Sequence, residues 1–204
     1  MKKLPLAPKS VFFTLQGEGH LRGFPCVFVR LGGCSIGCPS CDTDYKVDSK
    51  LLPADILGKV KDVTPEKWRD RWVWITGGEP TDHDLVPLIR LLKGAGYSVA
   101  VATAGHKRFT PTVDWLSVSP HTPSSWNQQY GHEIKIVPGL NGYSIEDFLE
   151  ARPDDETDFW YRYVQPLWKD GKEDEDSLAQ CLAFIAQHPN WALSRQDHKY
   201  WELP

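Results

Sequence analysis

Short runs of apolar residues, rich in β-branched and aromatic side chains, recur along the 204-residue chain. Polar residues rarely interrupt them, and this pattern is typical of strands that are buried on both faces of a parallel sheet. We therefore expect strands at residues 26–31, 72–76, 98–103, 115–119, 133–137, 159–164 and 191–194.

Helical patterns separate some of these strands. In residues 82–93, leucine and isoleucine recur at helical spacing and glycine follows as a stop signal. In residues 174–187 an acidic first turn suits the helix dipole, and Leu182 is expected on the apolar face. The expected helices are residues 54–63, 82–93, 144–150 and 174–187.

Alternation of strands and helices predicts an α/β fold with a mostly parallel sheet. The connections at residues 106–114 and 120–132 carry no helical pattern and are expected to be loops. Six or seven strands with so few helices predict a partial, incomplete TIM-like barrel, formed as a single domain over residues 1–204. Its active site would lie at the carboxyl ends of the strands, where the following loops gather.

The overall charge limits the classes of partner. The net charge is −4 and the sequence pI is about 6.0, whereas proteins that bind nucleic acid usually carry a basic excess. No run of about 18 apolar residues predicts a membrane span, and the basic N-terminus lacks the apolar core of a signal peptide. Three of the five cysteines are crowded together, which does not suit a secreted disulfide framework. We expect a cytoplasmic protein without nucleic-acid or membrane partners.

The crowded cysteines, Cys34, Cys38 and Cys41, follow the strand at 26–31 directly. Three thiolates can hold a [4Fe–4S] cluster and leave one iron open to a ligand. The same spacing could instead hold zinc, with Cys26 or His20 as a further ligand, although Cys26 is expected in the core. The cysteines alone leave both alternatives open.

A second stretch, Thr76-Gly77-Gly78-Glu79-Pro80, ends the next strand. Alone it predicts only a strand-to-helix turn, in which glycines let the backbone approach a ligand and Glu79 offers acceptors to an ammonium group. Together with the cysteine spacing, it resembles the radical S-adenosylmethionine superfamily.

Four more stretches narrow this resemblance. They are Phe13-Thr14-Leu15-Gln16-Gly17-Glu18-Gly19, Asp42-Thr43, Tyr163-Val164-Gln165-Pro166 and the C-terminal NWALSRQDHKYWELP. From about Val11 to the last residue, the chain resembles the 7-carboxy-7-deazaguanine synthase family. That resemblance implies a lyase of queuosine-type deazapurine biosynthesis, which converts 6-carboxy-5,6,7,8-tetrahydropterin to 7-carboxy-7-deazaguanine and ammonia through a 5′-deoxyadenosyl radical.

The resemblance implies three cofactors: a [4Fe–4S] cluster, S-adenosyl-L-methionine and Mg²⁺. Cys34, Cys38 and Cys41 would ligate the cluster, and Thr43 would contact Mg²⁺, which often keeps waters and borrows substrate oxygens. The residues expected against S-adenosylmethionine are Ser40, Cys41, Asp42, Gly78, Glu79, Ser119, Pro120, His121, Gln165, Pro166, Leu167 and Trp168.

The resemblance also implies a pterin site. Its expected residues are Leu15, Gln16, Gly17, Glu18, Arg30, Thr76, Gln196, His198 and Pro204, with Lys199 as a wall or surface residue. The planar guanidinium of Arg30 suits the substrate carboxylate. The pterin amino group and ring N–H could donate to Glu18 or to a terminal carboxylate on Pro204.

Three stretches depart from the family pattern. Ala102-Thr103-Ala104-Gly105 replaces Glu-Thr-Asn-Gly, Ser119-Pro120-His121 replaces Ser-Pro-Lys, and Asp197 replaces a threonine before His198. These departures affect the expected cofactor pocket more than the pterin site.

Two other functions remain as alternatives. One is a radical enzyme of the same superfamily with another substrate, such as an activase of a glycyl-radical protein. The other is a non-catalytic zinc-binding module. For the synthase, the resemblance implies a small electron donor such as flavodoxin or ferredoxin, and a homodimer.

Overall fold

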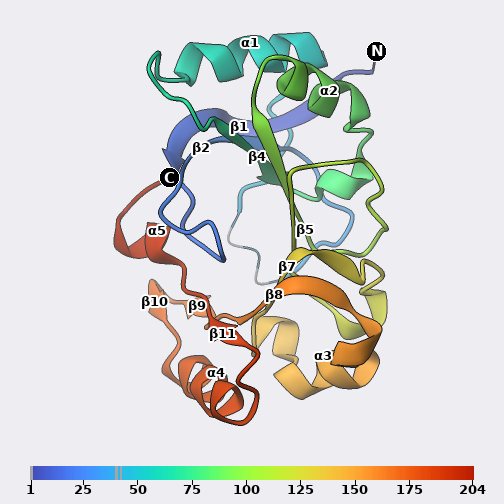
Figure 1. Cartoon of the computed structure of the whole chain (residues 1–204), viewed down its shortest axis with the longest axis vertical. Helices are drawn as coiled ribbons and strands as arrows, with labels where there is room; N and C mark the ends of the chain where they lie inside the picture. Colours follow the sequence, from blue (N-terminus) through green and yellow to red (C-terminus); the bar gives the residue numbers. More distant parts are fainter. Residues whose placement is uncertain (1, 40, 42) are drawn as a thin grey trace.

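Nine strands form one sheet in the computed structural model, which describes residues 2–39, 41 and 43–204 (Figure 1). The order across the sheet is β11-β8-β7-β6-β5-β4-β2-β1-β3, and β9 and β10 form a separate hairpin. The strands are β1 (Leu4–Leu15), β2 (Pro25–Leu31), β3 (Ser49–Leu51), β4 (Trp72–Gly77), β5 (Ser98–Thr103), β6 (Trp115–Val118), β7 (Tyr130–Ile136), β8 (Asp158–Val164), β9 (Trp168–Lys169), β10 (Lys172–Glu173) and β11 (Ala192–Leu193).

The seven strands expected from the sequence are present, and all seven run parallel, from β2 through β4, β5, β6, β7 and β8 to β11. Two further strands of this sheet, β1 and β3, were not expected, and neither was the β9–β10 hairpin. Strand β1 pairs antiparallel with both β2 and β3, and its register shifts between Leu6 and Val11, where Lys9 takes a positive φ of 48°. The sheet does not close, because its two outermost strands are β11 and β3. The partial barrel is confirmed.

Five α-helices and four short 3-10 turns connect the strands in the described residues. The helices are α1 (Pro53–Val63), α2 (Val86–Gly94), α3 (Ile145–Ala151), α4 (Glu175–Gln187) and α5 (Asp197–Tyr200), and the turns are η1 (Pro80–Asp82), η2 (Pro123–Ser125), η3 (Leu140–Gly142) and η4 (Asp154–Glu156). The expected helix over residues 82–93 is wrong at its start, since η1 ends at Asp82 and α2 begins at Val86. The connection 106–114 is a loop as expected, whereas 120–132 also contains η2 and the first residues of β7.

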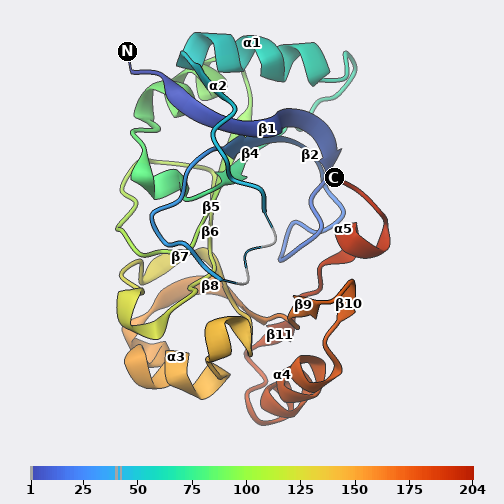
Figure 2. The same ribbon diagram turned by 180° about the vertical axis from the view of Figure 1, so that it is seen from behind.

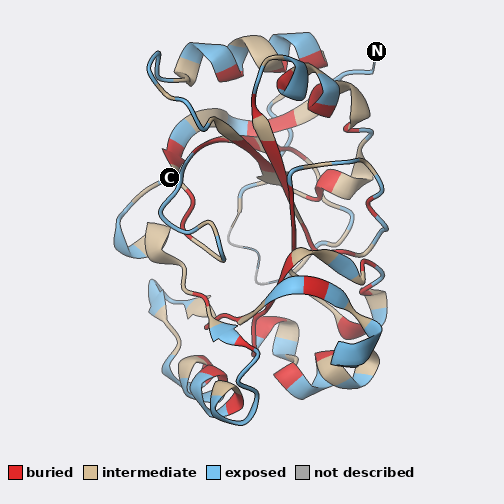
Figure 3. Cartoon of the chain, in the orientation of Figure 1, coloured by how far each residue is buried: buried red, intermediate tan, exposed pale blue. Residues whose placement is uncertain are grey.

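The main core lies between the sheet and helices α1 to α4. Ile56 of α1, Leu88 of α2, Phe148 of α3 and Cys181 of α4 are buried against strand residues such as Val101. Figure 3 shows the central strands as mostly buried and the outer faces of the helices as exposed. The expectation for α4 is wrong in one position, because Leu182 is 52% exposed. None of the helices in the described parts of the chain has the length and apolar content needed to cross a membrane.

The C-terminal segment runs across the open side of this curved sheet. Figures 1 and 2 show it passing from β11 through α5 and returning to the end of β1 and β2. Asp197 N–H donates to the Gly17 carbonyl at 3.0 Å, and Arg22 pairs with the Asp197 carboxylate at 2.9 Å. These contacts hold the C-terminal segment against the loop between β1 and β2.

Candidate active site

A pocket of about 490 Å³ opens at the carboxyl ends of the parallel strands and extends to the C-terminal segment. Its volume falls within the range of small-molecule sites. The sequence-predicted residues in its wall are Leu15, Gln16, Gly17, Glu18, Arg30, Cys34, Cys38, Cys41, Thr43, Thr76, Gly78, Glu79, Ser119, His121, Gln165, Leu167, Trp168, Gln196, His198, Lys199 and Pro204. Pro120 and Pro166 are not among the lining residues, and Ser40 and Asp42 lie outside the described residues.

The three clustered cysteines lie together at this pocket, and none of them is in a disulfide. Burial raises the pKa of Cys38, and the neighbouring thiols of Cys34 and Cys41 raise it further. Cys38 Sγ lies 3.0 Å from His121 Nδ1, and Cys41 Sγ donates to the Thr43 carbonyl at 3.6 Å. The two residues considered as a further zinc ligand lie elsewhere. Cys26 is buried in the core, where burial raises its pKa to about 12, and His20 stacks on Tyr161 with a centroid distance of 3.7 Å.

Among the described residues, no group of three or more His, Cys, Asp or Glu side chains is arranged to hold one metal ion.

The Gly77–Gly78 turn packs directly on the backbone that leads into the cysteine loop. Gly77 has a φ of 113°, and a Cβ at Gly78 would lie 1.7 Å from the Gly33 carbonyl oxygen. Gly78 N–H donates to the Leu31 carbonyl at 2.8 Å, and Glu79 N–H donates to the Gly33 carbonyl at 3.2 Å. Only glycine allows this approach of the two backbones. The turn therefore supports the cysteine loop as well as lining the pocket.

The Glu79 carboxylate is buried and connects the loops after β4 and β5. Its Oε1 accepts hydrogen bonds from Thr81 N–H at 2.9 Å, Thr81 Oγ1 at 2.7 Å and Thr103 Oγ1 at 2.6 Å, and its Oε2 accepts one from Ala104 N–H at 2.9 Å. The assignment of Glu79 to the cofactor stays a prediction. These bonds do explain how a loop with alanine at 102 and 104 is held, because the Thr103 side chain and the Ala104 backbone supply its polar contacts.

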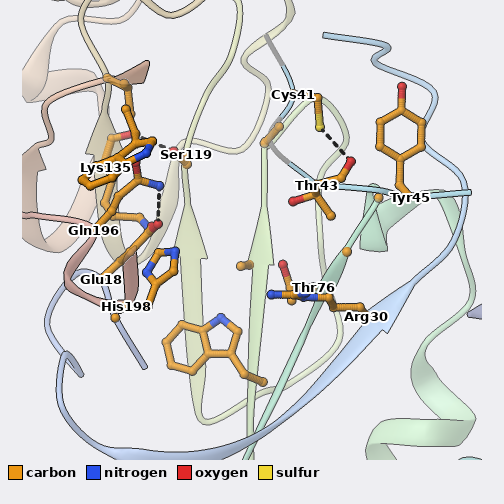
Figure 4. Close-up of a pocket in the computed structure, with 18 of the residues that line it drawn as sticks. Glu18, Arg30, Cys41, Thr43, Tyr45, Thr76, Ser119, Lys135, Gln196 and His198 are labelled. Carbon is orange, nitrogen blue, oxygen red and sulfur yellow. Dashed lines mark hydrogen bonds and ion pairs between the residues drawn. The ribbon is translucent and has the colours of Figure 1, made fainter. Parts of the chain in front are cut away.

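Charged and polar groups gather on the opposite side of the pocket from Cys41 and Thr43 (Figure 4). Glu18 pairs with Lys135, and Gln196 Nε2 donates to Glu18 Oε1 at 2.9 Å. Burial alone would raise the pKa of Glu18, but the charges of Lys135 and His198 and the hydrogen bonds from Lys135 and Gln196 lower it to about 2. Glu18 is therefore an ionised carboxylate at neutral pH.

The C-terminal segment packs directly on the loop that carries Glu18. A Cβ at Gly17 would lie 2.3 Å from His198 Nδ1, so the imidazole occupies the space that any side chain there would need. The segment then turns back on itself, since Leu203 N–H donates to the His198 carbonyl at 2.9 Å. Pro204 reaches the pocket wall as a result.

Arg30 and Thr76 stand side by side on neighbouring strands. They are paired in the parallel register of β2 and β4, and both line the pocket (Figure 4). The guanidinium of Arg30 lies 4.8 Å from the centre of the Phe12 ring, a distance at which the ring attracts the cation. Arg30 thus presents a fixed positive charge at the pocket wall.

Comparisons with known proteins identify relatives over nearly the whole chain. No family model matches the chain. The 7-carboxy-7-deazaguanine synthase of Burkholderia multivorans is 32% identical over 97% of this chain and 99% of its own, and that of Nitratidesulfovibrio vulgaris is 33% identical over 96% and 98%. The crystal structure of QueE from Escherichia coli aligns with a TM-score of 0.74 and 27% identity, covering 95% of this chain and 94% of that one.

The chain belongs to the 7-carboxy-7-deazaguanine synthase family. Its site holds further residues that sequence reasoning missed. The main ones are Lys135 on β7 and Tyr45 after the cysteine loop; Phe28 and Trp74 line the wall as well. Lys135 had a signal in the sequence, because two charged residues, Glu133 and Lys135, alternate within an otherwise apolar strand and therefore face the same side. In this family member, that side is the interior of the barrel.

Trp168 and Lys199, both expected near the site, lie in its wall. Lys199 Nζ lies 5.5 Å from the Trp168 ring centre and donates to Gln196 Oε1 at 3.2 Å. Trp168 also meets Tyr200 edge to face at 5.0 Å. This part of the wall is built by the C-terminal segment and the β9–β10 hairpin.

Proposed function

We propose that this protein catalyses the ring contraction of 6-carboxy-5,6,7,8-tetrahydropterin to 7-carboxy-7-deazaguanine with loss of ammonia, as a radical S-adenosylmethionine carbon–nitrogen lyase. Family membership supports the reaction. The observation that carries the proposal is that the three clustered cysteines and the Glu18–Lys135 pair share one pocket. A cluster-binding loop and a polar subsite for a heterocycle are both needed for this chemistry, and neither alternative function uses both.

The cysteines fit a [4Fe–4S] cluster. Cys34, Cys38 and Cys41 line the same wall without forming disulfides, and Cys38 is close enough to the other two for their charges to affect its pKa. These three residues would hold the cluster and leave one iron without a protein ligand. When bound, the cluster and S-adenosylmethionine supply the hydrogen-atom abstraction that begins the reaction.

The wall next to the cysteines would bind S-adenosylmethionine. Gly78, Ser119, His121, Gln165 and Leu167 lie in the same pocket as the thiols. Ser119 Oγ donates to the Lys135 carbonyl at 3.2 Å, and Gln165 Oε1 accepts from Ser194 at 2.7 Å. These bonds fix the side chains before any ligand binds. The wall also excludes water from the reacting centre, which protects reactive intermediates.

The pterin would bind between Arg30 and Glu18. The guanidinium of Arg30 suits the substrate carboxylate, and the ionised Glu18 can accept hydrogen bonds from the pterin amino group and ring N–H. Lys135 keeps Glu18 charged and fixed in position. Thr43, at the opposite side of the pocket, would contact Mg²⁺ together with substrate oxygens.

The proposal includes partners. Reduction of the cluster needs an external one-electron donor, which we propose is a flavodoxin or ferredoxin. We also propose that the protein acts as a homodimer.

Product analysis tests the proposal. The reconstituted protein is incubated anaerobically with reductant, S-adenosylmethionine, Mg²⁺ and carboxytetrahydropterin, and the mixture is examined by mass spectrometry. The expected product is 7-carboxy-7-deazaguanine, absent from a Cys34→Ala control. A protein that contains the cluster and cleaves S-adenosylmethionine without consuming the pterin would favour another radical enzyme. A reconstituted protein that contains zinc but no iron would favour the non-catalytic zinc-binding module.

A further inference from the structure

Ser35, directly after Cys34, is bound at two atoms by one carboxylate. Its N–H donates to Asp82 Oδ2 at 2.9 Å, and its Oγ donates to Asp82 Oδ1 at 2.8 Å. Asp82 is the last residue of η1, the turn that begins at Pro80 directly after Gly77–Gly78–Glu79. A two-point contact of this kind fixes the orientation of the peptide between Cys34 and Ser35, which a single hydrogen bond would leave free to rotate.

Two residues of the loop after β5 complete this cluster. His106 Nε2 lies 3.0 Å from Ser35 Oγ and 3.3 Å from Asp82 Oδ1, and Lys107 Nζ lies 2.5 Å from Asp82 Oδ1. His106 Nδ1 also faces Glu79 Oε2 at 3.9 Å. The cluster of Ser35, Asp82, His106 and Lys107 therefore joins three loops at the carboxyl ends of β2, β4 and β5.

The Asp82 side chain is 13% exposed, and its surroundings favour the charged form. Burial would raise the pKa of Asp82, but hydrogen bonds from Lys107 and Ser35 lower it to about 2. At neutral pH an ionised carboxylate, paired with Lys107, therefore lies against the residue that follows a cysteine assigned to the cluster.

We propose that Asp82 is a positioning residue for the iron–sulfur site, which holds the first part of the cysteine loop in its binding conformation before the cluster arrives and sets the charge beside it. This inference rests on the proposed function. Asp82 would act through Ser35 and would touch neither substrate nor cofactor.

Two physical effects follow from this arrangement. A preformed loop loses less conformational entropy when it binds the cluster, so removal of the carboxylate should weaken cluster uptake. The reduction potential of an iron–sulfur cluster also depends on nearby charge and on hydrogen bonds to its sulfurs. Ser35 N–H donates to Asp82 and not to a cluster sulfur, and the negative charge of Asp82 disfavours the added electron. Asp82 should therefore keep the reduction potential of the cluster low.

The first experiment uses metal-free protein, so it does not depend on cluster chemistry. Amide hydrogen exchange of Ser35 is measured in wild type, Asp82→Ala and Asp84→Asn. Asp84 is a matched control, since its Oδ1 accepts one bond from Val86 N–H, which asparagine can keep. We expect exchange at least tenfold faster in Asp82→Ala and unchanged in Asp84→Asn. Equal exchange rates in Asp82→Ala and wild type would overturn the proposal.

The second experiment uses Asp82→Asn, which keeps the shape of the side chain and one acceptor oxygen if Asp82→Ala fails to fold. After reconstitution, the midpoint potential of its cluster is determined by spectroscopic redox titration. We expect a positive shift, with the reduced-to-oxidised ratio at the wild-type midpoint rising at least threefold. An unchanged midpoint in fully loaded Asp82→Asn would contradict the electrostatic role and overturn the proposal. Failure of the wild type to take up iron would instead reject the proposed function, and the exchange comparison would still stand.

Discussion

Glu18 and Lys135 are an oppositely charged pair on the side of the pocket where we propose that the pterin binds. The folded-state pKa of Glu18 is about 2, below its ordinary value of 4.5. A carboxylate whose pKa is lowered on folding stabilises the folded state above its unfolded pKa, and this contribution is lost as the pH falls from about 5 to 2. Lys135, which is 7% exposed, would be left without this partner if Glu18 were neutral.

We therefore predict that Glu18→Gln lowers the free energy of unfolding at pH 7 by up to about 3 kcal/mol. The difference from wild type should shrink at pH 3, because Glu18 is then protonated in the unfolded chain, whose pKa is near 4.5, while it stays mostly ionised in the folded protein. Urea denaturation at both pH values measures it, with the exposed Glu66→Gln as the control. A loss of the same size at pH 3 and pH 7 would argue against an electrostatic origin.

At the residue scale, the sequence predicted most of the pocket but not the partners of its residues. The cysteines, Arg30 and Glu18 were expected and lie in its wall. Lys135 was missed because its alternation with Glu133 shows that the two side chains share a face of the strand, but not that this face lines the interior of the barrel. The Ser35–Asp82 contact joins residues 47 positions apart, and no local pattern encodes such a pair.

Among the structural elements, the turn at Gly77–Gly78 and the cysteine loop depend on each other. A side chain at 78 would meet the Gly33 backbone, which cannot rotate away as a flexible side chain can. The helix α1 offers a contrast, because a Cβ at Gly58 would meet nothing within 4 Å.

We predict that Gly78→Ala destabilises the protein by about 1–3 kcal/mol through overpacking and reduces iron uptake. Gly58→Ala should instead be neutral or stabilising by about 0.5–1 kcal/mol, since alanine is favoured inside a helix. Thermal unfolding and iron content after reconstitution measure both effects. Normal iron uptake by Gly78→Ala would show that the turn does not shape the cysteine loop.

The elements also show why some predictions from the sequence held and others did not. The parallel strands were recognisable because both of their faces are buried. Strand β1 has a mixed burial pattern and was missed, because an edge-side antiparallel strand lacks that continuous apolar signal. Helix α2 starts at Val86 rather than at residue 82 because Pro87 lacks an N–H donor and belongs in the first turn.

For the whole molecule, the central feature is an open barrel whose gap is crossed by the C-terminal segment. The sequence predicted the open barrel from the number of strands and helices. No local sequence pattern predicted the position of the C-terminal segment, because its helix α5 is only four residues long and too short to show a helical periodicity. That position depends on contacts with the loop at residues 16–24, above all the close approach of His198 to Gly17.

The cysteines and the Glu18 group lie on opposite sides of the pocket, so we expect that cluster binding and the proposed pterin binding can be perturbed separately. We predict that Gly17→Ala displaces His198, raising the KM for carboxytetrahydropterin at least tenfold while iron content stays at the wild-type level. Steady-state kinetics and iron analysis measure the two effects, with Gly58→Ala as the control. Reduced iron content with an unchanged KM would contradict this expectation.

The most direct test of the account is whether a three-cysteine cluster keeps one iron open for S-adenosylmethionine. Mössbauer spectra of protein reconstituted with enriched iron would be recorded with and without S-adenosylmethionine. We predict a [4Fe–4S] spectrum in which one iron site changes its isomer shift when the sulfonium compound is added. A cluster whose spectrum is unaffected by S-adenosylmethionine, or the absence of a cluster, would contradict the account.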